Sequence, residues 1–258
     1  MCLAVVALRA HPRYAVVLAA NRDEFYARAA APLARWKEQA GPELLAGRDL
    51  MAGGTWLGVA KTGRWAFVTN VREPGRNDPA APTRGALVPR VLRDSAPVTS
   101  AVESIAAERA RYNGFNLIAG DWSAAIWYSN RADAVRGLNP GVHGISNARL
   151  DTPWPKVLRL RDGISAWVAR GEDDPEPLFD LLADRRIAPD SELPATGVSL
   201  DWERALSAPF IITERYGTRC SSVITITCEG QVRFRERSFD RQGSPLADVE
   251  DSFVIAPG

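Results

Sequence analysis

Histidine and cysteine are scarce in this sequence, and their scarcity limits the chemistry that it can support. The 258 residues include two histidines, His11 and His143, and three cysteines, at positions 2, 220 and 228. The cysteines form no C-x-x-C pair, and two histidines cannot complete the ligand spacing of a zinc site. We therefore expect no resident metal or cofactor, and thiols that stay reduced in the cytoplasm.

A strong charge of one sign is also missing. The 32 basic residues nearly cancel the 31 acidic ones, so the chain lacks the positive field with which proteins hold nucleic acids or anionic membranes. No apolar run approaches the ~20 residues that span a bilayer. The apolar start has no basic region before it, as a signal peptide would, and Arg9, His11 and Arg13 interrupt it. We expect neither a nucleic-acid partner nor a membrane span.

The overall composition is that of an average globular protein. Hydrophobic residues make up 46% of the chain and charged residues 24%, which suffices for one substantial core. No repeat, low-complexity tract or flexible linker divides the sequence. We predict a single domain over residues 1–258.

Short apolar runs predict strands near both ends of the chain. Residues 2–8 and 14–21 are rich in Val and Leu, which predicts two adjacent antiparallel strands buried on both faces. Further strands are predicted in a hairpin over 55–70, a hairpin over 115–129, a strand ending at Asn147, and two strands over 221–228 and 231–239. In the last strand Val232 and Phe234 alternate with three arginines, so one face should be buried and the other wet and basic.

Helix signals lie between these strands. Ser100 and Glu103 form a capping-box pattern, which predicts a helix that ends before residue 113. Thr152 as N-cap, Pro153 at the first helical position and Gly171 past the end predict a second helix, and a shorter one is expected over 177–183. Strands early and late with helices between them predict an α+β fold whose sheets are covered by helices.

Cys2 carries the sharpest chemical question. Removal of Met1 would leave a thiol and a free α-amino group on the same residue. An amine with a pKa of about 7.7–8.0 can take the proton of a thiol with a pKa of about 8.5, which leaves a nucleophilic thiolate. Alternatively, Cys2 is a small apolar residue in a buried strand. The residue alone leaves both interpretations open.

Polar residues follow the second apolar run, in the stretch AANRDEF. By strand parity Asn21 and Asp23 share one face, and Arg22 and Glu24 share the other. An acid beside Cys2 could orient its amino group, and Asn donors could stabilise an oxyanion. The alternative is an ion-pair cluster at the end of a strand.

Six segments occur in a recognisable order: MCLAVVAL, NRDEF, GGTWLGV, TNVREP, GISNARLDTPWPKV and GTRCSSVI. Together they resemble the NRDE family, the transport-and-Golgi-organisation type of protein, from residue 1 to at least Val223. That family is similar to the N-terminal nucleophile hydrolases of the cholylglycine-hydrolase and penicillin-acylase branch. The resemblance implies a four-layer αββα sandwich.

The resemblance also implies catalytic roles. Cys2 matches the nucleophile that attacks an amide carbonyl, Asp23 the acid that holds the amine, Asn147 an oxyanion donor and Arg219 a late arginine near the thiol. One departure is clear: the hydrolases carry Arg-Asn-x-Asp, whereas this chain has Ala at position 20 and its arginine at Arg22.

Residues expected to contact a substrate are Asn21, Arg22, Asn70 and His143, with Asn70 also a looser match for a second oxyanion asparagine. His11 is expected to be exposed in its turn. Cys220 and Cys228 are expected on the core or a strand face, and the tryptophans in packing.

Two functions stay open from the sequence. The first is an N-terminal cysteine hydrolase that cleaves the amide or thioester of an acylated small molecule. The second is a non-catalytic carrier that binds haem or an acyl or lipid ligand in the same pocket. Either function implies a small acyl or haem-like ligand as partner, and neither indicates an oligomeric state.

Overall fold

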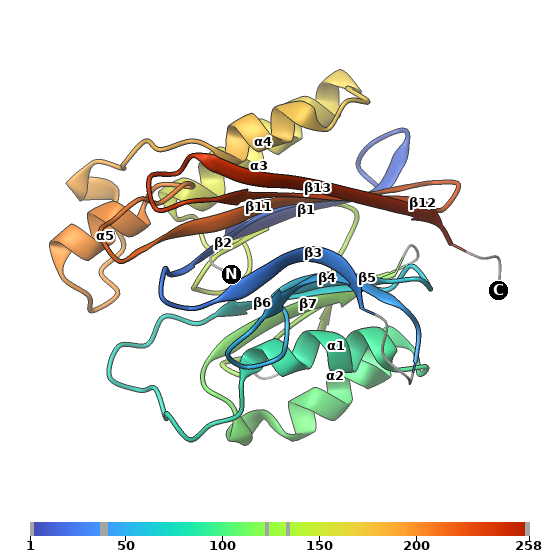
Figure 1. Ribbon diagram of the computed structural model, residues 1–258, viewed down its shortest axis with the longest axis horizontal. Helices are drawn as coiled ribbons and strands as arrows, with labels where there is room; N and C mark the ends of the chain where they lie inside the picture. The colour runs from blue at the N-terminus through green and yellow to red at the C-terminus, as the bar shows by residue number, and fades with distance from the viewer. Residues whose placement is uncertain (1–2, 37–40, 122–123, 133–134, 256–258) are drawn as a thin grey trace.

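The structure is a computed structural model that describes residues 3–36, 41–121, 124–132 and 135–255. These residues form two antiparallel β-sheets stacked face to face, with helices on the outer side of each sheet (Figure 1). The predicted α+β fold with two antiparallel sheets is therefore confirmed.

The first sheet has six strands in the order β10-β1-β2-β11-β12-β13, and every neighbouring pair is antiparallel. Its strands are β1 (Leu3–Leu8), β2 (Tyr14–Phe25), β10 (Gly141–Ile145), β11 (Tyr216–Thr227), β12 (Gln231–Phe239) and β13 (Pro245–Val254). The long strands β2 and β11 lie side by side at its centre. Strand β2 continues past its predicted end at residue 21, and β11 begins before its predicted start at residue 221.

The second sheet has seven strands, which follow one another in chain order. They are β3 (Ala30–Trp36), β4 (Leu44–Asp49), β5 (Leu57–Ala60), β6 (Trp65–Asn70), β7 (Phe115–Gly120), β8 (Ala125–Ser129) and β9 (Arg136–Gly137). The predicted hairpins β5–β6 and β7–β8 are confirmed. The β5–β6 turn needs Gly63, whose φ of 85° is one that favours glycine.

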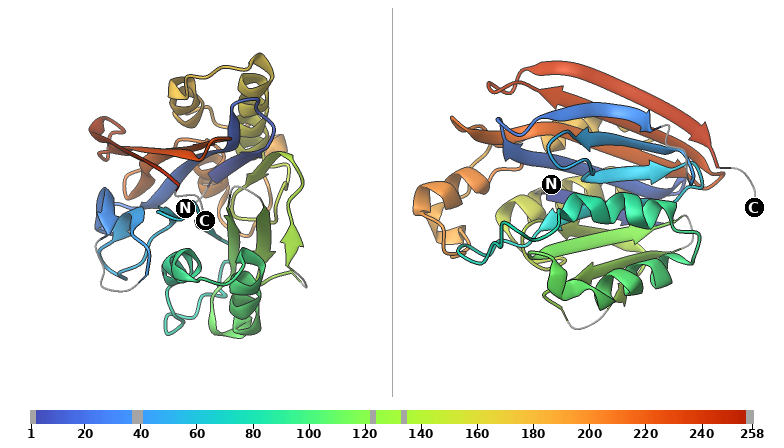
Figure 2. Two further views of the ribbon diagram at one scale, coloured as in Figure 1. Left: turned by 90° about the vertical axis from the view of Figure 1, so that its right-hand side faces the viewer. Right: turned by 60° about the horizontal axis from the view of Figure 1, so that its bottom comes forward.

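Helices α1 and α2 lie on one outer face of the stacked sheets and α3 and α4 on the other, while α5 lies at one end (Figure 1 and Figure 2). The structure contains α1 (Leu87–Arg93), α2 (Val98–Ala107), α3 (Pro155–Arg170), α4 (Glu176–Leu182), α5 (Leu200–Leu206) and the short 3-10 helices η1 (Arg84–Ala86), η2 (Arg109–Arg111) and η3 (Asp190–Glu192). Helices α1 and α2 pack on the seven-stranded sheet, and α3 and α4 on the six-stranded one. Among the described residues, no helix has both the length and the apolar character needed to cross a bilayer.

Strand parity sorts the core into layers. Even-numbered residues of β1 and β2, such as Val6 and Leu18, pack between the two sheets. Odd-numbered residues, such as Val5 and Val17, pack against Trp167 of α3. The prediction that both strands are buried on both faces is confirmed, because one face meets a sheet and the other meets helices.

Two predicted helix starts are wrong. Helix α2 begins at Val98 after Pro97, so Ser100 lies inside its first turn and no side chain caps it. Helix α3 begins at Pro155, not Pro153, and Thr152 instead donates its hydroxyl to a backbone carbonyl. A proline whose fixed φ already suits the first turn sets the start of α3. The predicted end at Gly171 is confirmed by its left-handed φ of 64°.

The prediction for His11 is also wrong. Its ring is buried and stacks on Trp167 with 4.9 Å between ring centroids, and its Nε2 lies 3.1 Å from the Glu172 carbonyl oxygen. Residues about 160 positions later in the chain cover His11. The prediction failed because it used only the polar residues next to His11 in the sequence. Cys220 is buried as expected, whereas Cys228 is exposed just beyond β11.

The outer face of β12 is not basic. Val232 and Phe234 are buried, as predicted. The three arginines between and after them form ion pairs with carboxylates: Arg233 with Glu250, Arg235 with Asp248 and Glu176, and Arg237 with the same two carboxylates. Acids of β13 and α4 therefore neutralise the predicted positive stripe.

Candidate functional site

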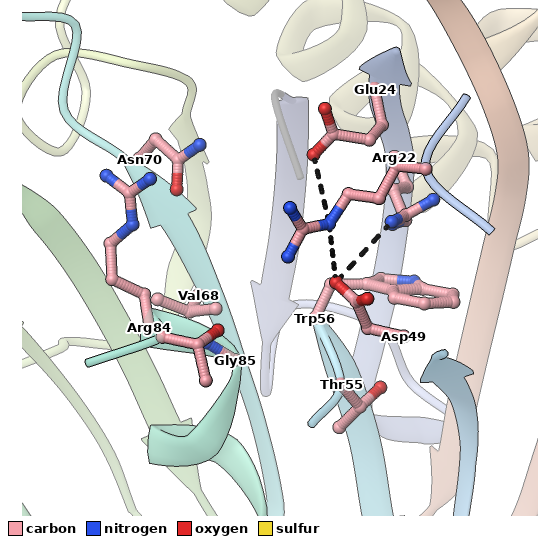
Figure 3. Close-up of a pocket in the computed structure, with 11 residues that line it drawn as sticks. Arg22, Glu24, Asp49, Thr55, Trp56, Val68, Asn70, Arg84 and Gly85 are labelled. Atoms are coloured by element: carbon pink, nitrogen blue, oxygen red, sulfur yellow. Dashed lines mark hydrogen bonds and ion pairs between the residues drawn. The ribbon is translucent and has the colours of Figure 1, made fainter. Parts of the chain in front are cut away.

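A cavity of about 100 Å³, which we call the central cavity, opens where the end of β2 faces β5 and η1 (Figure 3). Its walls are polar and come from both sheets. They consist of Arg22, Glu24, Arg28, Asp49, Thr55, Trp56, Val68, Asn70, Thr83, Arg84 and Gly85. Of the residues predicted to contact a substrate, Arg22 and Asn70 lie here.

Asp49 anchors the charges on one side of the central cavity. Its Oδ2 accepts a hydrogen bond from Arg28 Nε at 2.7 Å and lies 3.9 Å from Arg22 Nη2. Burial alone would raise the pKa of Asp49, but hydrogen bonds from Arg28 and from the backbone of Ala52 and Met51 hold that pKa below its ordinary value. Asp49 is therefore ionised, and its ion pair with Arg28 is closer than its ion pair with Arg22.

Two further cavities share walls with the central one. The Cys220 cavity, of about 220 Å³, also contacts Arg22 and Trp56; its other walls are Ala30, Ala31, Pro32, Arg219, Cys220, Glu236, Ser238, Phe239, Leu246 and Ala247. The Asn147 cavity, of about 290 Å³, also contacts Asn70 and Arg84; its other walls are Phe25, Val71, Arg72, Glu73, Pro74, Asn77, Asn147, Val198, Trp202, Leu206 and Tyr216. The central cavity therefore adjoins both of the others, with Arg22 and Trp56 on one side and Asn70 and Arg84 on the other as shared walls.

Asn70 and Asn147 meet although 77 positions separate them. Asn147 lies in a bend two residues after β10, and its Nδ2 donates to the Asn70 carbonyl oxygen at 2.9 Å. The backbone N–H of Arg72 in turn donates to the Asn147 carbonyl at 2.8 Å. These bonds fix the Asn147 side chain beside the end of β6.

Arg219 occupies a β-bulge beside Arg22. Thr218 pairs with Asp23 and Cys220 pairs with Arg22, so Arg219 is the extra residue of β11. Its Nη1 lies 3.3 Å from each of three carbonyl oxygens on the chain that leaves β2. Burial, and then repulsion from the charge of Arg22, lower the pKa of Arg219. The bulge thus brings two guanidinium groups to the same cavity.

Asn21 and Asp23 point to the opposite face of β2, as parity predicts. Asn21 Nδ2 donates to the carbonyl oxygens of Leu182 and Pro209, both at 2.8 Å, and its Oδ1 accepts from Ser221 Oγ at 2.6 Å. Asp23 Oδ1 accepts from Thr218 Oγ1 at 2.6 Å. Both amide hydrogens of Asn21 therefore bind backbone carbonyls, and its contact with a substrate stays a prediction.

Cys2 lies outside the described residues. Leu3, the next residue, pairs with Asn21 at the start of β1. His143 lies on β10, where its Nδ1 is 3.0 Å from Asp151 Oδ2 and its Nε2 is 2.9 Å from the Asn139 carbonyl. It lines none of the three cavities described above. The roles predicted for Cys2, Asp23 and His143 stay predictions.

A family model described as Transport and Golgi organisation 2 matches residues 1–241. The chain belongs to this family. It is 37% identical to the Transport and Golgi organization protein 2 homolog of Bos taurus over 244 residues, and 35% identical to that of Homo sapiens over 242 residues. Each alignment covers 87% of both chains. The resemblance expected from the six sequence segments is confirmed.

Solved structures with the same fold include two variants of the conjugated bile acid hydrolase from Clostridium perfringens. Their TM-scores are 0.55 and 0.52, at 9% and 8% sequence identity. The matches cover 98% and 99% of this chain and 92% of each hydrolase chain. At such low identity the likeness shows the fold alone, and it confirms that this member of the Transport and Golgi organisation 2 family has an N-terminal nucleophile hydrolase-like fold.

Sequence reasoning missed Glu236 of β12. It is 1% exposed; its Oε1 accepts from the Leu33 N–H at 2.8 Å and its Oε2 from Ser222 Oγ at 3.2 Å. Burial raises the pKa of this carboxyl. A signal was present, because Glu236 continues the buried alternation of Val232 and Phe234. An acid at a core position of a strand is a candidate site residue.

Proposed function

We propose that this member of the Transport and Golgi organisation 2 family is an N-terminal cysteine hydrolase that cleaves the amide or thioester bond of an acylated small molecule. The proposal rests on one observation. Arg22, Asn70, Asn147 and Arg219, which come from four separate strands or strand ends, line three adjoining cavities that share wall residues. Cys2 directly precedes Leu3 of β1, which is paired with the strand that carries Arg22.

The fold relatives add to this support. The bacterial structures with the same fold are hydrolases of a conjugated bile acid by name. The expected chemistry follows from an N-terminal cysteine: its amino group takes the thiol proton, and the thiolate attacks the carbonyl carbon. The leaving amine or thiol departs with that proton, and water then releases the acid from the thioester that remains on Cys2.

Asparagine amides supply the donors that this chemistry needs. Asn147 Nδ2 carries two hydrogens, of which the Asn70 carbonyl takes one. The other is the donor that we assign to the developing oxyanion. Arg219 would favour the thiolate by its charge, and Asp23 would hold the amino group.

Intact mass and thiol labelling test the proposal. The untagged chain should lose Met1, and a chloromethyl ketone probe should label Cys2 faster than Cys228, an exposed thiol in the same molecule. Cleavage of a panel of acyl amides and thioesters should then be lost in Cys2→Ser and kept in Cys228→Ser. Retained Met1, or labelling of Cys2 no faster than of Cys228, would contradict the proposal.

A carrier function is the second candidate, favoured by the apolar walls of the Cys220 cavity. Ala30, Ala31, Pro32 and Leu246 line one side of it. A carrier would bind haem or a fatty acyl ligand saturably after the thiol of Cys2 is blocked, and would release no product. The cytoplasmic location stays a prediction, which cell fractionation can test.

A further inference from the structure

The Cys220 cavity holds more positive than negative charge. Arg22 and Arg219 both line it, and Glu236 is the carboxyl among its walls. The Glu236 oxygens accept hydrogen bonds from Leu33 and Ser222, and burial raises its pKa. Even with Glu236 ionised, the charge on the walls is positive, so the cavity suits an anion.

The two arginines lack a close carboxylate of their own. The side chain of Arg22 is 4% exposed, and its ion pair with Asp49 is long, at 3.9 Å, because Arg28 holds Asp49 at 2.7 Å. Arg219 Nη1 faces backbone carbonyls, which carry no full charge. Arg22 is buried and Arg219 is half-buried. Their charges repel each other, and an anion between them would reduce that cost.

Hydrogen-bond donors without acceptors point the same way. Within the part of the chain that the structure describes, Arg22 Nη1, Arg219 Nε and Trp56 Nε1 are buried and have no hydrogen-bond partner. A buried donor left without an acceptor is costly. All three belong to side chains that line the Cys220 cavity. A carboxylate, which only accepts hydrogen bonds, is the group that satisfies such a set.

The remaining walls define the rest of the ligand. The volume of about 220 Å³ exceeds what a carboxylate group alone would fill, and alanine, proline and leucine side chains face it. We propose that the Cys220 cavity binds a small organic acid. Its carboxylate receives hydrogen bonds from Arg22, Arg219 and Trp56, and its hydrocarbon part packs against Ala30 and Leu246. This binding needs no reaction at Cys2; the cavity shares Arg22 and Arg219 with the proposed hydrolase site, and the inference names the class of ligand that this part of the site takes.

Calorimetric titration of the full-length Cys2→Ala variant tests the proposal, because this variant binds without turnover. Hexanoate should bind about tenfold more tightly than hexanamide, since the carboxylate adds charge-assisted hydrogen bonds. It should also bind more tightly than inorganic phosphate, which lacks a hydrocarbon chain. Equal affinity for hexanoate and hexanamide would overturn the anion site, and tighter binding of hexyl phosphate or of phosphate than of hexanoate would overturn the carboxylate assignment.

Substitutions locate the binding within the cavity. In the same background Arg219→Gln should weaken hexanoate binding about tenfold. Trp56→Phe keeps an aromatic ring and removes only the indole N–H, so it should weaken binding about threefold to tenfold even if the arginine variant folds poorly. Arg136→Gln is the matched control, because Arg136 also stacks on a tryptophan, 5.8 Å from the Trp127 ring centroid, on distant β9. Hexanoate affinities in Trp56→Phe and Arg219→Gln equal to that of the control would overturn the proposal.

Discussion

The guanidinium carbon of Arg22 lies 4.4 Å from the centroid of the Trp56 ring. Arg22 belongs to β2 of the six-stranded sheet, and Trp56 directly precedes β5 of the seven-stranded sheet. The contact therefore bridges the two sheets at the point where the central cavity meets the Cys220 cavity. A cation over a tryptophan face that is shielded from water contributes on the order of 2 kcal/mol, so this pair helps to hold the two sheets together. It also forms the wall between the central cavity and the Cys220 cavity.

Gly47 of β4 controls where Trp56 sits. A Cβ atom at position 47 would lie 2.5 Å from two carbons of the Trp56 indole, closer than side chains tolerate. We expect Gly47→Ala to displace the indole and to lower the free energy of unfolding by about 1–3 kcal/mol, measured by urea denaturation. Gly137→Ala is the control: among the described residues, apart from its chain neighbours, nothing lies within 4 Å of a Cβ placed there, and a change beyond about 0.5 kcal/mol is not expected. Equal effects of the two substitutions would refute the packing argument.

Asn21 stabilises the fold through three buried hydrogen bonds. Asn21→Ala would leave the carbonyls of Leu182 and Pro209 without their donor and Ser221 without its acceptor. Because each unsatisfied buried group costs about 1–3 kcal/mol, we expect a loss of roughly 3 kcal/mol or more in chemical denaturation. Ser221→Ala breaks one of the three bonds and should cost about 1 kcal/mol. A stable Asn21→Ala protein that no longer binds ligand would contradict this structural role and support the predicted substrate contact.

The strands that sequence patterns predicted are those with a strong apolar signal. The runs that became β1, β2 and β5 to β8 are buried along almost their whole length. Strands β3, β4, β9 and β13 were missed; β3, β9 and β13 lie at sheet edges, whereas β4 is an internal strand and mostly buried. Along β13 exposed and half-exposed residues alternate, so neither an apolar run nor a buried face marks it. Helix α5 was missed for the same reason, since a single one of its residues, Glu203, is buried.

The site shows a similar limit. Asn70, Asn147 and Arg219, which line the adjoining cavities, were named from the resemblance to a family. The residues next to each of them in the sequence contain no signal that would place the three together. The register shift at Arg219 depends on how β11 pairs with β2, and a β-bulge of this kind leaves no periodic signal. Glu236, by contrast, could have been found from its position in the alternation of β12.

The buried carboxyl of Glu236 should make stability depend on pH. Burial raises its pKa above the ordinary value of 4.5, so the folded chain keeps a proton that the unfolded chain releases. Its contribution to stability is therefore full below about pH 4.5 and is lost as the pH rises through the folded pKa. Glu236→Gln cannot titrate, and we expect it to become more stable relative to the parent chain as the pH increases from 4 to 8. If the difference in unfolding free energy between Glu236→Gln and the parent chain stayed constant from pH 4 to 8, the raised pKa of Glu236 would be contradicted.

The ion pair of His143 and Asp151 should also make stability depend on pH, and here the histidine is the group that titrates near neutral pH. The hydrogen bond that His143 Nδ1 donates to the Asp151 carboxylate raises the pKa of His143 above its ordinary 6.5, although burial opposes this shift. The pair therefore stabilises the fold fully below pH 6.5 as long as Asp151, whose own pKa is lowered, stays ionised. This contribution disappears as the pH rises through the folded pKa of His143. Asp151→Asn is a matched change, since asparagine tolerates the φ of 55° at this position and can still accept the Gly144 N–H.

The measurement is an NMR titration of the two histidines, with His143→Gln to assign the signals. In the parent chain we expect His143 to titrate above 6.5, and in Asp151→Asn to titrate closer to 6.5. The destabilisation caused by Asp151→Asn should be larger at pH 6 than at pH 8.5, because only the protonated imidazole gains from the carboxylate. An equal loss at both pH values would mean that Asp151 acts through its bond to Gly144 alone, and His143 would then have no part in the stability of β10.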